Sequence, residues 1–130
     1  MPMNCVISIV DDDRSVREGT MDMLNSMGFV AIAFERPDEF LEFDRLHSTS
    51  CLIADMQLPE MTGLELYEHM VESDNAVPTI LITAFPDDRD RGRALQAGVL
   101  CYLIKPFNES ELLACIRSAL KLRQTNSRGC

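Results

Sequence analysis

Short apolar runs alternate with amphipathic stretches along almost the whole chain. The runs are four to six residues long, and their length and flanking turn residues predict buried strands rather than helices. We place these strands at Cys5–Val10, Phe29–Phe34, Cys51–Ala54, Thr79–Thr83 and Cys101–Ile104. The stretches between them repeat apolar residues at helical spacing. This alternation predicts an α/β fold in which stacked strand-helix units build one parallel sheet.

Turn and capping residues predict where the helices begin and end. Gly28 ends the first helix, Pro37 begins the second, and Gly63 begins the third. The last helix opens with Asn108 and Glu111, whose spacing is that of a capping box. The predicted inner side of the third helix consists of Leu66, Tyr67, Met70 and Val71.

The stretch from Pro86 to Gln96 differs from the other predicted helices because most of its residues are charged. The apolar residues available for contacts at its end are Ala94, Leu95 and Ala97. We therefore expect a helix that packs thinly on the sheet and is a candidate moving part.

The length and charge of the chain limit what it can be. We expect one domain over residues 1–123, and a loose tail or the start of a linker over residues 124–130. The formal net charge of -9 argues against a surface that binds nucleic acid or an anionic membrane. No apolar stretch approaches the roughly 18 residues that span a bilayer, so we expect a cytoplasmic protein. The five cysteines have no paired spacing and are interpreted as reduced core residues.

Acidic residues stand where two of the predicted strands end. Asp11 and Asp12 follow the first strand, and Asp55 follows the third. Parallel strands open their carboxyl ends on one edge of the sheet, so we expect these three carboxylates to meet there. Neighbouring carboxylates repel each other, and a hard divalent cation such as Mg²⁺ would hold them together. Asp13 is better explained as the cap of the first helix.

Two further polar residues close strands at the same edge. Thr83 ends the fourth strand, and Lys105 follows the fifth. The hydroxyl and the ammonium group could each bind a phosphoryl oxygen, and the carboxylate of Asp55 could attack an activated phosphoryl donor once a metal screens the charge. Each residue alone has an ordinary structural explanation. Together, on separate strand ends, they predict a site for phosphoryl transfer.

Four motifs, in this order, carry a resemblance to a known family. They are Ile-Val-Asp11-Asp12-Asp13, Asp55-Met-Gln-Leu-Pro59-Glu-Met-Thr-Gly63, Leu-Ile-Thr83-Ala84 and Tyr102-Leu-Ile-Lys105-Pro106-Phe107. The chain up to about Arg123 resembles the receiver domain of two-component response regulators, and its Val-Asp-Asp-Asp opening is similar to transcription regulators of the NarL and FixJ type. The resemblance implies a flavodoxin-like, CheY-like doubly wound sheet of five parallel strands in the order 2-1-3-4-5, with helices on both faces.

The resemblance implies a phosphoacceptor domain. Asp55 would take a phosphoryl group from a histidine kinase or a histidine phosphotransfer protein. Mg²⁺, or Mn²⁺ in its place, would be held by Asp11, Asp12, the carboxylate of Asp55 and the main-chain carbonyl of Gln57. Such a domain signals rather than catalyses, since beyond taking up the phosphoryl group from phosphohistidine it only hydrolyses its own aspartyl phosphate slowly.

The resemblance also implies a conformational switch. Thr83 and Lys105 would bind the phosphoryl oxygens, and the peptide bond before Pro106 is typically cis in the family. Thr83 would move toward the phosphoryl group, and the ring of Tyr102 would swing into the space it leaves. As a further hypothesis, the apolar ring of Phe85 would shield the aspartyl phosphate from water.

The switch would reshape the surface made by the fourth helix, the fifth strand and the fifth helix. A phosphorylation-dependent homodimer could form through that surface. We expect partner choice to reside near Arg14 and Ser15 at the first helix, and we expect no direct binding of nucleic acid or membrane by this domain. Both a single-domain regulator and a receiver joined to an output domain agree with the sequence.

Two other families remain as alternatives. Asp11 and Asp13 after an apolar strand resemble the nucleophile and acid of a haloacid dehalogenase-like, Mg²⁺-dependent phosphatase. In that family a second acidic pair follows the lysine, whereas here Asp87 and Asp88 precede Lys105. A flavodoxin-like binding module would need a first loop rich in Ser, Thr and Gly to bind a phosphate. The first loop here is acidic and would repel that group.

Overall fold

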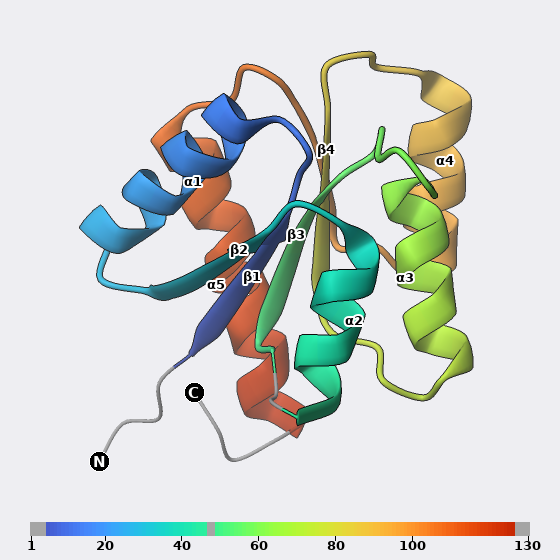
Figure 1. The fold of residues 1–130 in the computed structure, drawn as a ribbon, viewed down its shortest axis with the longest axis horizontal. Coiled ribbons are helices and arrows are strands. Elements are labelled where there is room, and N and C mark those ends of the chain that lie inside the picture. Colours follow the sequence, from blue (N-terminus) through green and yellow to red (C-terminus); the bar gives the residue numbers. More distant parts are fainter. Residues whose placement is uncertain (1–4, 47–48, 127–130) are drawn as a thin grey trace.

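The computed structural model describes residues 5–46 and 49–126. Within them, five strands alternate with five helices along the chain (Figure 1). The strands are β1 Val6–Val10, β2 Val30–Phe34, β3 Cys51–Asp55, β4 Thr79–Thr83 and β5 Cys101–Ile104. The helices are α1 Arg14–Ser26, α2 Pro37–Leu46, α3 Gly63–Glu72, α4 Asp88–Ala97 and α5 Glu109–Asn126. The predicted strands are confirmed to within one residue at each end.

All five strands lie parallel in one sheet with the order β2-β1-β3-β4-β5, which confirms the predicted topology. Val10 at the end of β1 pairs with Ala54, and Asp55 pairs with Ile82, so Asp55 is the last residue of β3. The carboxyl ends of the strands therefore lie along one edge of the sheet, at the top of Figure 1, where the loops to the following helices begin.

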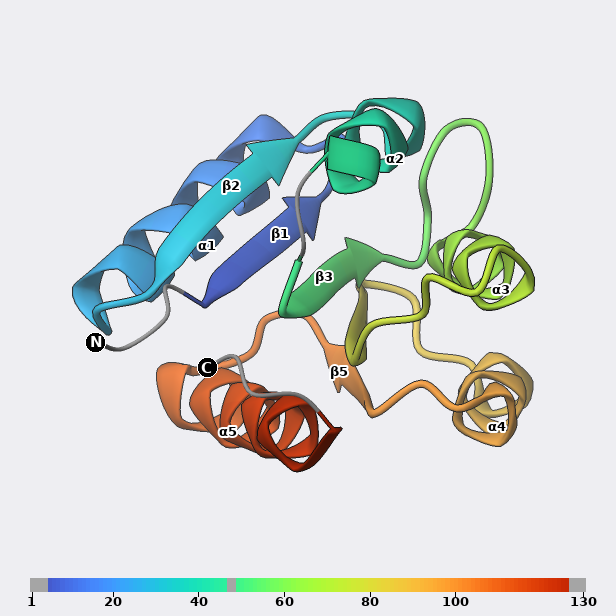
Figure 2. The same ribbon diagram turned by 90° about the horizontal axis from the view of Figure 1, so that it is seen from below.

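Helices cover both faces of the sheet (Figure 2). Because successive strand residues point to opposite faces, Ile53 packs with α1 and α5, whereas Leu52 and Ala54 pack with α2, α3 and α4. The apolar core on the α1 and α5 face also buries Leu24 from α1 and Ile116 from α5. The site edge is thus supported by two apolar layers, one on each face.

Local sequence signals explain the start of α5 and the buried side of α3. The N–H of Asn108 donates to Oε1 of Glu111 at 3.0 Å, and the N–H of Glu111 donates to Oδ1 of Asn108 at 2.8 Å, which confirms the predicted capping box. On α3, Tyr67 and Met70 are buried as predicted. The prediction for Val71 is wrong, because this residue falls one position past the buried stripe and is exposed.

Helix α4 is held by even fewer contacts than the sequence predicts. Ala94 is its one buried residue, whereas Leu95 and Ala97 face solvent. Its ends are well formed, since the side chain of Asp87 caps the first turn and Gly98, with a φ of 114°, ends the helix. The helix is therefore locally stable and only loosely attached to the sheet.

The C-terminal part of the chain differs in detail from the sequence prediction. Helix α5 continues to Asn126, into the stretch predicted as a tail, and residues 127–130 lie outside the described residues. Neither α5 nor any other helix of the described part is long and apolar enough to cross a membrane.

Three of the cysteines are free thiols, as predicted: Cys51, Cys101 and Cys115. Burial raises the pKa of Cys115 to about 12, so its thiol is unreactive near neutral pH. Cys5 is disulfide-bonded, contrary to the prediction. It stands just before β1, where it is half-buried and outside the packed core.

Candidate functional site

Polar residues from four strands meet at the carboxyl edge of the sheet. Asp11 follows β1, Asp55 and Thr83 end β3 and β4, and Lys105 follows β5. Asp11 and Thr83 are fully buried, and Asp55 is 5% exposed. The structure brings together four of the five residues that the strand ends single out in the sequence, and the fifth, Asp12, is exposed.

Lys105 lies between the two buried carboxylates. Its Nζ atom is 3.3 Å from Oδ2 of Asp11 and also contacts Oδ2 of Asp55. Burial alone would lower the pKa of Lys105, but the hydrogen bond to Asp55 and the charges of both acids outweigh it and raise the pKa above its usual value. Lys105 is therefore a permanent positive charge inside the site.

The surroundings of Asp11 disfavour its charged form. Burial raises the pKa of Asp11 from 3.8 to about 6. The N–H of Asp13 donates to Oδ1 of Asp11 at 2.9 Å and lowers the pKa, the charge of Asp55 raises it, and Lys105 lowers it again. The favourable contacts do not outweigh burial and repulsion, so added positive charge would stabilise the carboxylate.

The loop after β3 fixes the orientation of Asp55. The main-chain N–H of Gln57 donates to Oδ1 of Asp55 at 2.7 Å, while Oδ2 faces Lys105. Gly63 begins α3 directly against this strand end, since a Cβ at that position would lie 2.6 Å from the main-chain oxygen of Asp55. A glycine is thus required where α3 passes the end of β3. With Gln57 and Lys105 beside it, each carboxylate oxygen of Asp55 has a hydrogen-bond donor.

The donor atoms at this edge fit a hard divalent cation in kind. Mg²⁺ and Mn²⁺ prefer carboxylate and carbonyl oxygens, which Asp11, Asp55 and the loop residue Gln57 can supply. In the conformation described, no three acidic, His or Cys side chains of residues 5–46 and 49–126 are grouped closely enough to hold a metal ion. Asp12 is exposed, and Lys105 contacts both buried acids. Metal binding would therefore need the Asp12 side chain and Lys105 to move.

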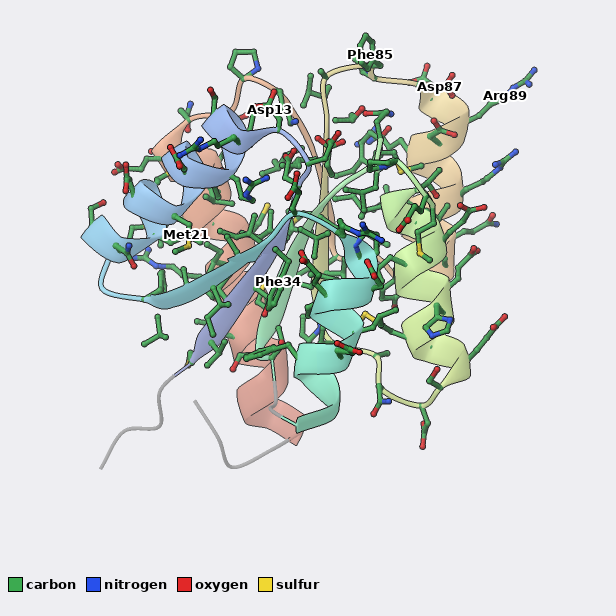
Figure 3. The ribbon with its side chains drawn as sticks, viewed as in Figure 1. Asp13, Met21, Phe34, Phe85, Asp87 and Arg89 are labelled. Carbon is green, nitrogen blue, oxygen red and sulfur yellow. The ribbon has the colours of Figure 1, made fainter. Side chains whose placement is uncertain are left out.

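Asp13 stands apart from the buried acids. Its side chain accepts a hydrogen bond from the N–H of Val16 at 3.2 Å and caps α1, as predicted. Figure 3 shows Asp13 where α1 begins. A phosphatase of the haloacid dehalogenase type would need Asp13 to act beside Asp11 on one substrate. Because the Asp13 carboxylate is already used as a helix cap, the geometry gives that alternative no support.

The hydroxyl of Thr83 takes part in two hydrogen bonds. Its Oγ1 donates to Oε1 of Gln57 at 2.9 Å and accepts from the N–H of Phe85 at 3.0 Å. Gln57 therefore contacts Asp55 through its main chain and Thr83 through its side chain. The resemblance implies only a main-chain role for Gln57, and no sequence pattern indicates which residue of the loop reaches the neighbouring strand.

The hydroxyl of Tyr102 is buried and makes no hydrogen bond of ordinary geometry with the described residues. Burial raises the pKa of Tyr102, and the charge of Asp90 raises it further. The main chain of Asp87 and the side chain of Thr83 lie near enough to lower this pKa slightly. The hydroxyl thus already lies inside the domain in this structure, and the predicted swing of the ring stays a prediction. The peptide bond between Lys105 and Pro106 is cis, as expected from the resemblance.

Phe85 does not cover the site. The residue is 70% exposed, and Figure 3 shows its ring projecting outward from the loop between β4 and α4. The ring is therefore not packed over the strand ends in this conformation, and its shielding of an aspartyl phosphate stays a prediction.

Arg17 supports the site and was missed in the sequence. Its Nη1 atom donates to the main-chain oxygen of Asp11 at 2.8 Å. The N–H of Asp11 donates to the main-chain oxygen of Phe34 at 3.1 Å, so the end of β1 is held from both sides. The signal available in the sequence was a long basic side chain in the first turns of α1, directly after the acidic loop. From there the side chain can reach back to the main chain of that loop.

Comparisons with known proteins agree with this geometry. The sequence matches the response regulator receiver domain over residues 7–117. It is 37% identical over 117 residues to response regulator protein TodT of Pseudomonas putida, which covers 90% of this chain and 52% of TodT. It is 30% identical over 115 residues to transcriptional regulatory protein FixJ of Bradyrhizobium diazoefficiens, covering 88% of this chain and 56% of FixJ.

A solved structure shows the same likeness. The response regulator StyR has a TM-score of 0.84 to this structure and 37% sequence identity, and the match covers 95% of this chain and 62% of StyR. The chain spans about half the length of the curated relatives it matches.

Proposed function

The chain belongs to the response regulator receiver domain family, and we propose that Asp55 is the residue on which it carries a phosphoryl group. Members of this family are the signalling domains of two-component systems, and the response regulators receive the phosphoryl group from histidine kinases. TodT and FixJ, which are named as regulators, contain the matched domain as about half of their length.

The observation that carries the assignment is the fixed orientation of the Asp55 carboxylate. Oδ1 accepts from the N–H of Gln57 at 2.7 Å, and Oδ2 contacts Lys105, at an exposure of 5% for the residue. One oxygen would attack the phosphorus atom of a phosphohistidine. The phosphorus–nitrogen bond would break, and its electron pair would return to the imidazole ring of the donor.

Lys105 and Thr83 would bind the oxygens of the transferred group. When Asp55 becomes an acyl phosphate, its negative charge passes to the phosphoryl oxygens, and the ammonium group of Lys105 is already beside that position. The Thr83 hydroxyl is buried on the adjacent strand and could donate its proton from the other side. The movement of Thr83 and the response of Tyr102 would make the switch.

Asp11, Asp12, the carboxylate of Asp55 and the main-chain carbonyl of Gln57 would hold Mg²⁺ or Mn²⁺. The bound ion would supply positive charge against the phosphoryl oxygens. The supporting observation in this chain is the pKa of Asp11, which burial raises to about 6 and the charge of Asp55 raises to a lesser extent. Asp11 is thus poised to gain from a cation, while Arg17 keeps its main chain in place.

Partners follow from the same proposal. A histidine kinase or a histidine phosphotransfer protein would dock beside the acids, where Arg14 and Ser15 are exposed at the start of α1. The face made by α4, β5 and α5 would carry the response, and it exposes Leu95 (43%) and Ile104 (50%), which suit a phosphorylation-dependent homodimer. The domain would signal through such contacts, with slow hydrolysis of its own aspartyl phosphate.

The test is incubation of the full chain with acetyl phosphate and Mg²⁺, followed by intact-mass measurement. We expect wild type to gain the mass of one phosphoryl group, and Asp55→Asn to gain none. The Asp13→Asn variant is the matched control, because asparagine caps a helix about as well as aspartate and should leave the mass gain unchanged. A wild-type mass gain that persists in Asp55→Asn would refute the assignment.

A further inference from the structure

Gln57 connects the two residues that the proposed function treats as acceptor and switch. We infer that the side chain of Gln57 is a positioning residue that competes with the phosphoryl group for the Thr83 hydroxyl, and so stabilises the unphosphorylated conformation. This inference rests on the proposed role of Asp55. It goes beyond it by assigning a function to a side chain whose main chain alone has a role in metal binding.

The hydrogen-bonding capacity of Thr83 makes the competition unavoidable. A threonine hydroxyl has one proton to donate. In the structure, that proton is directed to Oε1 of Gln57 at 2.9 Å, and the same Oγ1 atom accepts from the N–H of Phe85 at 3.0 Å. A phosphoryl oxygen on Asp55 is an acceptor and needs the same proton. The hydroxyl must therefore release Gln57 before it can bind the phosphoryl group.

Gln57 is held in position to act as the competing acceptor. Its main-chain N–H donates to Oδ1 of Asp55 at 2.7 Å, and Gln57 pairs with Thr62 in an antiparallel bridge across the loop. Its side chain then spans from this loop to the end of β4, to a residue 26 positions later. The Oε1 atom is thus placed beside Thr83 by the backbone that also orients Asp55.

The second hydrogen bond of Thr83 links the competition to the next loop. Because the N–H of Phe85 binds the same Oγ1 atom, a rotation or shift of the hydroxyl changes the environment of that amide. Phe85 lies on the loop that leads to α4, whose one buried side chain is Ala94. Release of Thr83 from Gln57 would therefore first change the conformation of the loop that leads into α4.

The size of the effect is set by the strength of one neutral hydrogen bond. Such a bond changes an equilibrium about two- to tenfold when one partner is solvent-exposed, as Gln57 is. Removal of the Gln57 acceptor should therefore tighten the binding of a phosphoryl mimic by about the same factor. A bond of this size biases the switch without locking it.

The test is a double-mutant cycle on the full chain. Beryllium trifluoride, as an unreactive phosphoryl mimic, is titrated at fixed saturating Mg²⁺ into wild type, Gln57→Met, Thr83→Val and the double variant. Occupancy is followed by amide chemical shifts in ¹H–¹⁵N spectra. Methionine has the length of glutamine without the acceptor and keeps the main-chain carbonyl, and valine keeps the shape of threonine without the hydroxyl.

We expect Gln57→Met to bind the mimic about two- to tenfold more tightly than wild type, and to have no effect in the Thr83→Val background. We also expect the amide signal of Phe85 to shift in Gln57→Met before any mimic is added. Equal tightening in both backgrounds, or none in either, would overturn the inference. Absence of saturable binding to wild type would contradict the role of Asp55 as well. The Asp55→Asn variant, which lacks the carboxylate, is the non-binding control for that outcome.

Discussion

Lys105 reaches across the site to Asp11, 94 positions earlier in the chain, with 3.3 Å between Nζ and Oδ2. The same ammonium group also contacts Asp55, so one positive charge faces two buried carboxylates. Burial raises the pKa of Asp11 to about 6, and the charge of Asp55 adds to this, although a lysine is within hydrogen-bond reach. The site has a net negative charge, and its stability should respond to pH, to metal ions and to single charge changes.

The first prediction concerns Asp11→Asn, which should stabilise the domain at pH 7 by on the order of 2 kcal/mol. The pKa of Asp11 is raised from 3.8 in the unfolded chain to about 6 in the folded one, so the folded state is penalised fully above pH 6. The penalty falls as the pH is lowered and is absent below 3.8, where Asp11 is protonated in both states. Asparagine can still accept the hydrogen bond from Asp13.

The measurement is urea unfolding of wild type and Asp11→Asn at pH 7 and near pH 4. The stabilisation should be present at the higher pH and shrink toward zero at the lower one. Asp12→Asn, at an exposed position, is the control and should change stability by less than about 0.5 kcal/mol at either pH. An equal loss of stability in Asp11→Asn at both values would show that burial does not disfavour its charge.

The second prediction concerns Lys105→Met, which removes the cation from both acids. At pH 7 we expect a loss of about 2–4 kcal/mol in the free energy of unfolding, because two buried carboxylates remain without a compensating positive charge. Combining it with Asp11→Asn should recover much of the loss, since only Asp55 then stays charged. Denaturant unfolding of the two single variants and the double variant measures the coupling free energy between Lys105 and Asp11. Strictly additive effects would show that the three groups do not interact.

The third prediction is that Mg²⁺ stabilises the domain through the acids of the β1–α1 loop. At 10 to 100 times its Kd, a bound ion should raise the free energy of unfolding by about 1 to 3 kcal/mol. The variant Asp12→Asn should lose most of this gain, whereas Asp13→Asn should keep it because asparagine preserves the helix cap. Thermal unfolding with and without the ion measures both. If Asp13→Asn lost the gain instead, the metal ligands would be wrongly assigned.

The fourth prediction compares two glycines. In Gly63→Ala, the new Cβ would meet the main-chain oxygen of Asp55 at 2.6 Å and the side chain of Leu81 at 2.9 Å. We expect a loss of about 1–3 kcal/mol and a reduced phosphoryl gain from acetyl phosphate, because the strand end must shift. The control is Gly19→Ala, inside α1 with open space around it, which should stabilise by about 0.5–1 kcal/mol. Equal behaviour of the two variants would contradict the close approach.

Much of the site could be predicted because its residues interrupt strong patterns. Asp11, Asp55 and Lys105 each follow a short apolar run, and the strand-helix alternation alone is enough to bring such positions to one edge of a parallel sheet. The capping box of Asn108 and Glu111 was predictable for a different reason. Its two hydrogen bonds are made within one turn of chain, so the sequence spacing contains the whole interaction.

Contacts between distant loops could not be predicted in this way. The hydrogen bond from Thr83 to Gln57 depends on which side chain of the β3–α3 loop turns toward β4, and no sequence spacing records that choice. Arg17 reaches Asp11 through the conformation of a long side chain. Val71 and Leu95 were wrongly placed inside because an apolar residue at the border of a helical stripe falls in or out with a small rotation of the helix.

That Ala94 is the one buried side chain of α4 has a mechanical consequence. Displacing this helix by a fraction of a turn would uncover little apolar surface, whereas moving α5, which buries Leu112, Ile116 and Ala119, would open a core layer. We therefore expect the flank of α4 to move more easily than the flank of α1 and α5. A small push delivered at the strand ends would be absorbed by the α4 flank as a change of shape, while the flank of α1 and α5 stays as it was.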